Sequence, residues 1–211
     1  MPHPDHPHEI RTVSRPVEIR NDSDGNVTRL EGYAAVFDSP TTIGGPAPFQ
    51  EVVDRGAFDD VLGDDVRVLF NHDPNLLLGR TKSGTAKISI DEHGLRYEVT
   101  PPATQVGKDV LALVKRGDVD GSSFGFRVLK DTWTEGTTSD ELPLRRIQKV
   151  ALYDVSPVTQ PAYSTSSVEA RNAAHAISEV VERRKETKRD ALAETNKRRH
   201  QVAENISNMY S

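Results

Sequence analysis

Three short polar motifs of the chain supply a hydroxyl nucleophile, an imidazole base and a carboxylate. They are Asn71-His72-Asp73, Gly121-Ser122-Ser123-Phe124-Gly125 and Tyr153-Asp154-Val155-Ser156. A serine hydroxyl is a weak nucleophile until a base takes its proton and a third group orients that base. His72, Ser123 and Asp154 are therefore candidate catalytic residues. Their order along the chain, His then Ser then Asp, matches none of the orders of the familiar serine hydrolases and points to a less common protease.

The serine motif also fits the pattern G-x-S-x-G, with Ser123 at its centre. In α/β-hydrolases this pattern lies between a buried strand and a following helix. Here residues 110–116 are typical of the end of a helix that stops at Gly117, and residues 124–130 are typical of a strand. The order helix, turn, strand argues against a nucleophile elbow, and therefore against an esterase or lipase.

Ser122 competes with Ser123 for the role of nucleophile. Side chains alternate along a strand, so Ser123 points away from the apolar face of Phe124 and Phe126. This alternation favours Ser123. Backbone amides near two glycines of the motif are candidate oxyanion donors: Gly121 and Gly125.

The candidate base and carboxylate each have a second interpretation. His72 follows an apolar strand, where an imidazole can point into a cleft, but taken alone it is more typical of a histidine in a surface loop. Asp154 interrupts an apolar run and needs a partner there, which is either a charged imidazole or an arginine such as Arg145 or Arg146. The remaining histidines considered for the role of base are better explained as solvated residues: His93 and His175.

The composition excludes several classes of protein. The chain has 211 residues, no cysteine and a net charge of −5, of which residues 168–211 carry +2 and residues 1–167 carry −7. An acidic body argues against sequence-independent nucleic-acid binding. Without cysteine, disulfides and thiolate zinc sites are excluded. No apolar run approaches a membrane span or a signal peptide, so we expect a soluble, intracellular protein. We also expect no cofactor and no metal.

Many short strands with a few helices predict a mainly β, α+β fold. Alternating patterns predict strands over 17–20, 27–37, 51–54, 66–70, 85–90, 95–100, 123–133 and 144–155, with helices over 55–62 and 104–117. We expect a closed or strongly curved antiparallel β-barrel with surrounding helices, plus a long C-terminal helix. The predicted organisation is a disordered tail (1–16), a barrel domain (17–167) and a charged helical extension (168–211).

Four motifs, in this order along the chain, resemble those of the HK97-type prohead (capsid maturation) proteases of tailed phages. They are Leu30-Glu31-Gly32-Tyr33-Ala34-Ala35-Val36-Phe37, Asn71-His72-Asp73-Pro74 followed by Leu78-Gly79-Arg80-Thr81, Gly121-Ser122-Ser123-Phe124-Gly125-Phe126, and Val155-Ser156-Pro157-Val158-Thr159-Gln160-Pro161-Ala162-Tyr163. Together they are far more specific than any one alone. The resemblance covers roughly residues 17–167.

The resemblance implies a serine endopeptidase related in fold to the herpesvirus assemblins. It implies that His72 and Ser123 are catalytic, with Asp154 as the third member, where the assemblins use a second histidine. It also implies action inside the immature capsid, in the host cytoplasm, on scaffold or capsid-protein N-terminal segments and on the protease itself. The implied partners are therefore the major capsid protein and the scaffold, with self-association possible and with neither nucleic acid nor membrane. The alternative is a non-catalytic capsid scaffold or assembly protein.

Overall fold

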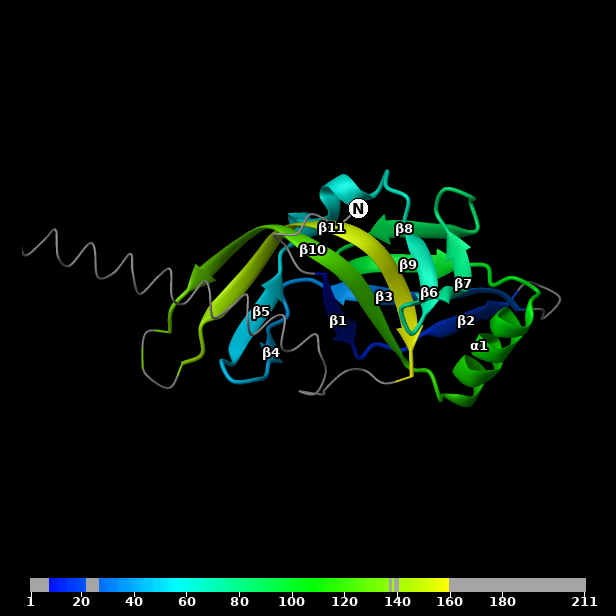
Figure 1. Cartoon of the computed structure of the whole chain (residues 1–211), viewed down its shortest axis with the longest axis horizontal. Helices are drawn as coiled ribbons and strands as arrows, with labels where there is room; N and C mark the ends of the chain where they lie inside the picture. The colour runs from blue at the N-terminus through cyan, green and yellow to red at the C-terminus, as the bar shows by residue number, and fades with distance from the viewer. Residues whose placement is uncertain (1–7, 22–26, 137, 139–140, 160–211) are drawn as a thin grey trace, which may run out of the picture.

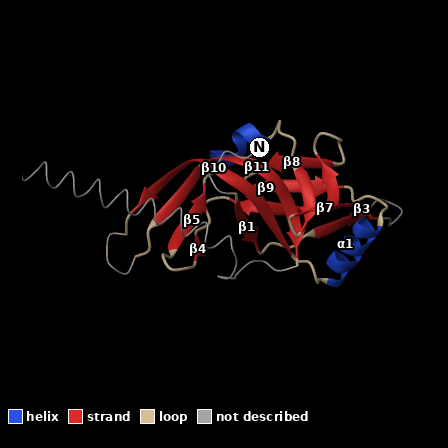
Figure 2. Ribbon diagram, in the orientation of Figure 1, coloured by secondary structure: helices blue, strands red, loops and turns tan. Residues whose placement is uncertain are grey.

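The computed structural model describes residues 8–21, 27–136, 138 and 141–159. In chain order its elements are β1 (Glu9–Val13), β2 (Glu18–Asn21), β3 (Val27–Val36), β4 (Thr41–Ile43), β5 (Phe49–Val53), the 3-10 helix η1 (Arg55–Val61), β6 (Arg67–Phe70), β7 (Asp73–Arg80), β8 (Ala86–Ile90), β9 (Gly94–Val99), α1 (Gln105–Arg116), β10 (Gly121–Thr134) and β11 (Leu144–Val158). Figures 1 and 2 show that strands dominate the described part of the chain.

Two elements follow directly from local sequence signals. The predicted strands over 85–90 and 95–100 are confirmed as the hairpin of β8 and β9, whose turn is closed by the Asp91 carboxylate accepting the backbone N–H groups of His93 and Gly94 at 2.8 and 3.1 Å. The predicted helix is confirmed as α1, which ends at Gly117. That glycine has φ 81°, a left-handed conformation that costs glycine little and terminates helices.

The strands form two sheets. Four strands make an antiparallel sheet in the order β2-β3-β9-β8. Seven strands make the other, in the order β1-β10-β11-β5-β4, with β6 paired to β11 and β7 to β6. β10 and β11 are its longest strands, at 14 and 15 residues, and they pair antiparallel along most of their length. In Figure 1 they run from β4 and β5 at one end towards α1 at the other.

Both sheets contribute side chains to one buried core. Phe124 of β10 stacks on Phe126 with ring centroids 4.5 Å apart and meets Phe58 of η1 edge-on at 5.6 Å. The four-stranded sheet and α1 add further fully or nearly fully buried side chains: Leu30, Leu95, Tyr97, Val99, Val110 and Val114. Burying this apolar surface is the main force that holds the two sheets together.

The predicted antiparallel β-barrel is wrong, because neither sheet closes on itself within the described residues. β11 changes partner along its length: residues 144–147 pair with β5, and Asp154 and Val155 pair with β6. Both pairings are parallel, so the sheet is mixed and branches at β11 instead of closing. Helices do not surround it, since α1 and the short η1 are the two helices of the described part. The predicted helix over 168–211 lies outside the described residues.

One further difference concerns the N-terminus. Residues 9–13, which we expect from the sequence to belong to a disordered tail, form strand β1 and pair with β10. As for membranes, none of the helices in the described ranges has the length and apolar character that crossing a bilayer requires.

Candidate active site

His72 lies at the tip of a two-residue turn between β6 and β7. Asn71 and His72 both have positive φ, 52° and 60°. This left-handed conformation suits the twist of two-residue hairpins but is uncommon for residues other than glycine, asparagine, aspartate and histidine. The turn consists of Asn71 and His72 alone, since the two residues that follow, Asp73 and Pro74, begin β7.

The tip of this hairpin is held against the end of β11. The His72 backbone N–H donates to the Ser156 hydroxyl at 3.2 Å, and the Asn71 N–H donates to the Pro157 carbonyl at 3.2 Å. The Asn71 side-chain oxygen accepts the Thr159 N–H at 3.0 Å. These bonds offset the strain of the turn and give the imidazole a defined direction.

Ser123 lies on the opposite side of β10 from the core, as the alternation predicts. Its neighbours Ser122 and Phe124 point inward, where the Ser122 hydroxyl lies 2.9 Å from the Tyr97 phenol oxygen. Burial raises the pKa of Tyr97 more than this bond lowers it, so the phenol stays protonated. On the other side, Ser123 Oγ lies 2.6 Å from His72 Nε2. The structure therefore brings Ser123, and not Ser122, to the histidine.

Asp154 of β11 lies on the other side of the imidazole. Its Oδ1 is 2.6 Å from His72 Nδ1, and its side chain is only 8% exposed. The alternative partners are engaged elsewhere: Arg145 with Glu9, Glu51 and Asp131, and Arg146 with Asp54 at 2.6 Å. The carboxylate is thus compensated by the imidazole, not by an arginine.

Gly125 makes room for this carboxylate. It pairs with Asp154 across the β10–β11 ladder, and a Cβ at position 125 would lie 2.5 Å from Asp154 Oδ2. A real Cβ cannot approach so closely, so any side chain here would displace the carboxylate. The second glycine of the serine motif is therefore required by packing around Asp154. Its amide, like that of Gly121, lies in β10, and the oxyanion role of both stays a prediction.

Ser156 completes the group and was missed by the sequence analysis as a functional residue. It is fully buried, its hydroxyl donates to Asp154 Oδ1 at 3.2 Å, and it accepts the His72 N–H. The available signal was its spacing, because residues two apart on a strand share a face. We refer to Ser123, His72, Asp154 and Ser156 as the His72 cluster.

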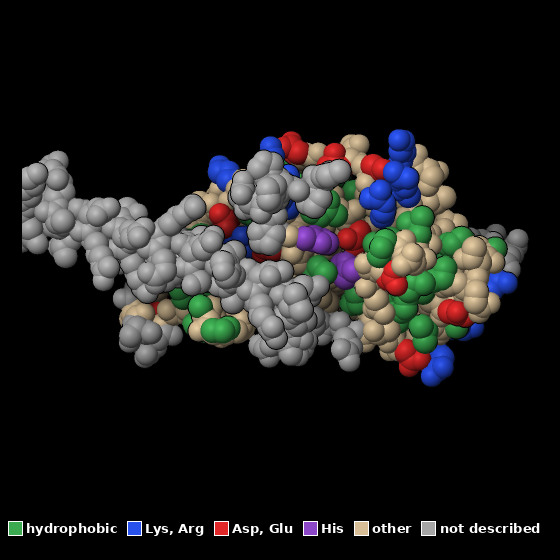
Figure 3. All heavy atoms as spheres, in the orientation of Figure 1, with side chains coloured by type: hydrophobic (Ala, Val, Ile, Leu, Met, Phe, Trp, Pro, Cys, Tyr) green, Lys and Arg blue, Asp and Glu red, His purple; other side chains and the backbone are tan. Residues whose placement is uncertain are grey.

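The His72 cluster has the geometry of an activated hydroxyl. A carboxylate at Nδ1 favours the tautomer with the proton on that nitrogen, which leaves Nε2 free to accept the Ser123 proton. Ser123 has no exposed surface, and the His72 side chain is 14% exposed. Figure 3 shows histidine side chains near the middle of one face, between hydrophobic side chains and beside acidic ones.

Neither His93 nor His175 is part of this cluster as described, whereas His8 Nε2 lies near it, 2.7 Å from where a Cβ at Gly125 would be. His93 is exposed in the β8–β9 turn, 3.6 Å from Glu92, and His175 lies outside the described residues. His8 contacts the Tyr153 ring edge-on, with centroids 5.2 Å apart. Within the described ranges, no three His, Asp or Glu side chains gather in a group that could hold a metal ion.

Comparison with known proteins agrees with the resemblance seen in the motifs. A family model described as caudovirus prohead serine protease matches residues 15–182. The prohead protease of Enterobacteria phage HK97 is 31% identical over 180 residues, covering 81% of this chain and 72% of that protein. The bacteriophage T4 capsid assembly protease gp21 matches at 13% identity with a TM-score of 0.48, over 72% of this chain and 98% of that one. The chain therefore belongs to the family of caudovirus prohead serine proteases.

Proposed function

We propose that the chain is a serine endopeptidase that cleaves scaffold or capsid-protein N-terminal segments, and itself, inside the prohead. The observation that carries this proposal is the continuous path from Ser123 Oγ to His72 Nε2 and from His72 Nδ1 to Asp154 Oδ1, at 2.6 Å each. Family membership supports the same chemistry, and the name of the HK97 relative supports the setting.

In the proposed mechanism His72 acts first as a base and then as an acid. Its Nε2 takes the Ser123 proton while Ser123 Oγ bonds to the carbonyl carbon of a peptide. Asp154 accepts a hydrogen bond from the Nδ1–H group and so stabilises the imidazolium. The C–N bond then breaks, and His72 gives its proton to the leaving amine. Water, deprotonated by His72, next attacks the acyl-serine ester, which releases the new carboxyl end and returns the proton to Ser123.

The test is Ser123→Ala co-expressed with the matching capsid protein. We expect this variant to stop capsid processing. Ser122→Ala is the matched control and should keep processing, because Ser122 bonds to Tyr97 and does not face His72. Processing at the wild-type rate by Ser123→Ala would contradict the assignment of the nucleophile.

A covalent probe separates the protease from a scaffold or assembly protein. A serine-reactive phosphonate should label the wild-type protein at Ser123 and leave both Ser123→Ala and His72→Ala unlabelled. A non-catalytic assembly protein would show no labelling and would assemble capsids normally when His72 is replaced. Hydrolysis of small esters without peptide cleavage would favour an esterase instead.

A further inference from the structure

Strand β1 lies beside the proposed nucleophile and contacts it. A peptidase must bring its hydroxyl to a substrate carbonyl, yet Ser123 is completely buried. Its hydroxyl contacts the chain's own N-terminal strand, which forms an edge of the seven-stranded sheet as described and pairs antiparallel with β10 from Glu9 opposite Phe126 to Val13 opposite Ser122. In this register Thr12 lies directly across from Ser123.

β1 also places a peptide carbonyl at the nucleophile. Ser123 Oγ lies 2.9 Å from the carbonyl oxygen of Arg11, which can accept its proton, and 3.4 Å from Thr12 Oγ1. Before bond formation a substrate's carbonyl carbon has to lie about 3–3.5 Å from this Oγ, so a substrate carbonyl competes with that of Arg11 for the space beside the hydroxyl. The hydroxyl has one proton and two acceptors, Arg11 O and His72 Nε2, so this contact competes with activation.

An added antiparallel strand is a common way for proteins to bind extended peptides, since a sheet edge offers a row of unpaired N–H and C=O groups. We propose that the edge of β10 beside Ser123 is a peptide-binding site for an extended strand, and that β1 is its intramolecular occupant, which a substrate must displace. This inference rests on the proposed function, because it concerns how a substrate reaches the same serine.

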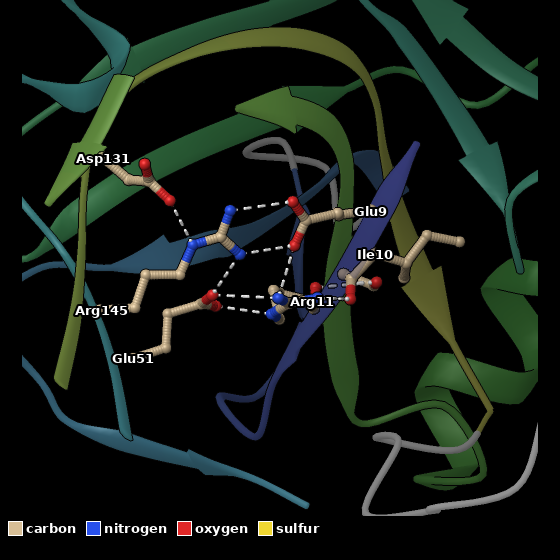
Figure 4. Close-up of polar contacts among 7 residues, drawn as sticks. Glu9, Ile10, Arg11, Glu51, Asp131 and Arg145 are labelled. Atoms are coloured by element: carbon tan, nitrogen blue, oxygen red, sulfur yellow. Dashed lines mark hydrogen bonds and ion pairs between the residues drawn. The ribbon is translucent and has the colours of Figure 1, made fainter. Parts of the chain in front are cut away.

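Five charged side chains hold β1 in place, and we call them the ionic cluster (Figure 4): Glu9, Arg11, Glu51, Asp131 and Arg145. Arg11 donates two hydrogen bonds to the nearly buried Glu51, at 2.5 and 2.9 Å. Glu9 accepts two from Arg145, at 2.9 and 3.1 Å, and one from Arg11 at 2.7 Å. Ionised groups with bidentate geometry make the stronger kind of hydrogen bond, so these contacts anchor the strand well.

The anchors lie on β5, β10 and β11, not on the hairpin that carries His72. Releasing β1 therefore breaks bonds to the ionic cluster and the β10 ladder while leaving the bonds among His72, Asp154 and Ser156 intact. A tethered occupant competes with any free peptide at a high effective concentration. The apparent affinity for substrate is then reduced by the fraction of molecules in which β1 is open. Such a device restrains a protease that is synthesised among its own substrates.

The experiment compares phosphonate labelling of Ser123 in the full-length wild-type chain, Arg11→Ala and Arg20→Ala. Arg20 is the matched control, because it lies on the next N-terminal strand, β2, and forms an ion pair with Glu31 of β3. Both strands belong to the four-stranded sheet, which does not contain β1. We expect Arg11→Ala to label roughly tenfold faster or more, since removing one partner of a buried ion pair destabilises the segment that carries it. Arg20→Ala should label at the wild-type rate.

Two further measurements make the outcome independent of any one variant. Hydrogen exchange of the β1 amides should accelerate together with labelling in Arg11→Ala. A fluorescent peptide with the sequence of residues 8–13 should bind Arg11→Ala, slow its labelling, and bind the wild-type chain more weakly; a scrambled peptide should do neither. Fast labelling of the wild type while its β1 amides remain protected would overturn the inference, as would loosened β1 amides with no change in labelling.

The inference and the proposed function fail in different ways. Absence of labelling in every variant, with β1 shown to be open, would overturn the nucleophile assignment. Peptide binding to the open variant would then still support a peptide site on β10. A third outcome is that all three chains label at one rate although β1 is loosened in Arg11→Ala alone. This outcome would support Ser123 as the nucleophile and reject β1 as the occupant.

Discussion

The His72 cluster and the ionic cluster both include side chains of the long strands β10 and β11, but they are built on different principles. In the His72 cluster a single path links the hydroxyl, the imidazole and the carboxylate, because the imidazole bridges Ser123 and Asp154 with one nitrogen each. In the ionic cluster partners are shared: Arg145 contacts Glu9, Glu51 and Asp131, and Arg11 contacts Glu9 and Glu51.

This difference follows from what each cluster has to do. Proton transfer needs one donor and one acceptor at hydrogen-bond distance, so a second partner competes with the reaction. Buried charges need as many partners as the geometry allows, because an unpaired one is costly. We therefore expect the His72 cluster to fail when any member is altered and the ionic cluster to tolerate the loss of one peripheral member.

The largest effect is expected for His72→Ala. Removing the base should lower the rate of peptide cleavage by about 10³-fold or more, because the hydroxyl loses its only route of activation. Thermal melting should change far less than activity does. His93→Ala, an exposed histidine in the β8–β9 turn, serves as the control and should cleave at the wild-type rate.

Gly125→Ala should come next, although the glycine carries no reacting group. The added Cβ displaces the Asp154 carboxylate, and losing such an orienting carboxylate costs a serine protease up to about 10⁴-fold in kcat. We expect a loss of about 10²-fold or more, measured as kcat on a capsid-derived peptide. Gly63→Ala is the matched control, since no atom lies within 4 Å of a Cβ there. Equal activities for the two variants would contradict the packing role of Gly125.

Ser156→Ala tests whether support of the His72 cluster matters as well as its reacting groups. Ser156 is a positioning residue, and a hydrogen bond to a charged group contributes about 1.5–3 kcal/mol, so kcat should fall roughly tenfold or somewhat more. KM should change little, and Ser156→Thr should restore part of the rate because it keeps the hydroxyl. A change in KM alone would place Ser156 in substrate binding instead.

Asp131→Ala tests the redundancy of the ionic cluster. Asp131 is half-buried. When its carboxylate is removed, Arg145 still has its hydrogen bonds to Glu9 and Glu51. The free energy of unfolding should therefore fall by less than about 1 kcal/mol, the size of a partly exposed ion pair. Urea unfolding measures it. A loss as large as that of breaking a buried pair, about 3 kcal/mol or more, would show that the cluster is not redundant.

The smallest effect expected is a pH dependence carried by Glu9. Burial alone would raise its pKa, but Arg11 and Arg145 together outweigh burial and hold the pKa below the ordinary value of 4.5. A lowered pKa means that Glu9 stabilises the fold above about pH 4.5 and loses this contribution as the pH falls through its folded pKa. In urea unfolding, the stability of Glu9→Gln should fall less steeply than that of the wild type below pH 4.5. Parallel curves would contradict this.

Much of the candidate site was visible in the chain before any fold was known. The alternation in β10 indicated that Ser123 faces away from Phe124 and Phe126, and three polar motifs supplied the hydroxyl, imidazole and carboxylate. Each of these signals is local, since it depends on residues within a few positions of one another. The hairpin of β8 and β9 and the helix α1 were predictable for the same reason.

The remaining features depend on pairings between distant segments. The sequence left open whether Asp154 meets an arginine or His72, which is 82 positions away, and packing decided for His72. The predicted barrel failed because β11 pairs in parallel with β5 and β6, and no local pattern states which strands become neighbours.

Alternation and turn chemistry thus determined, from the sequence by itself, which residue types face which side of each strand. Only the tertiary structure decided that β1 lies across Ser123 and that Ser156 supports Asp154 and His72. The physical reason is that side-chain direction follows from the backbone of a few residues, whereas the choice of a strand's neighbour follows from the packing of the entire core.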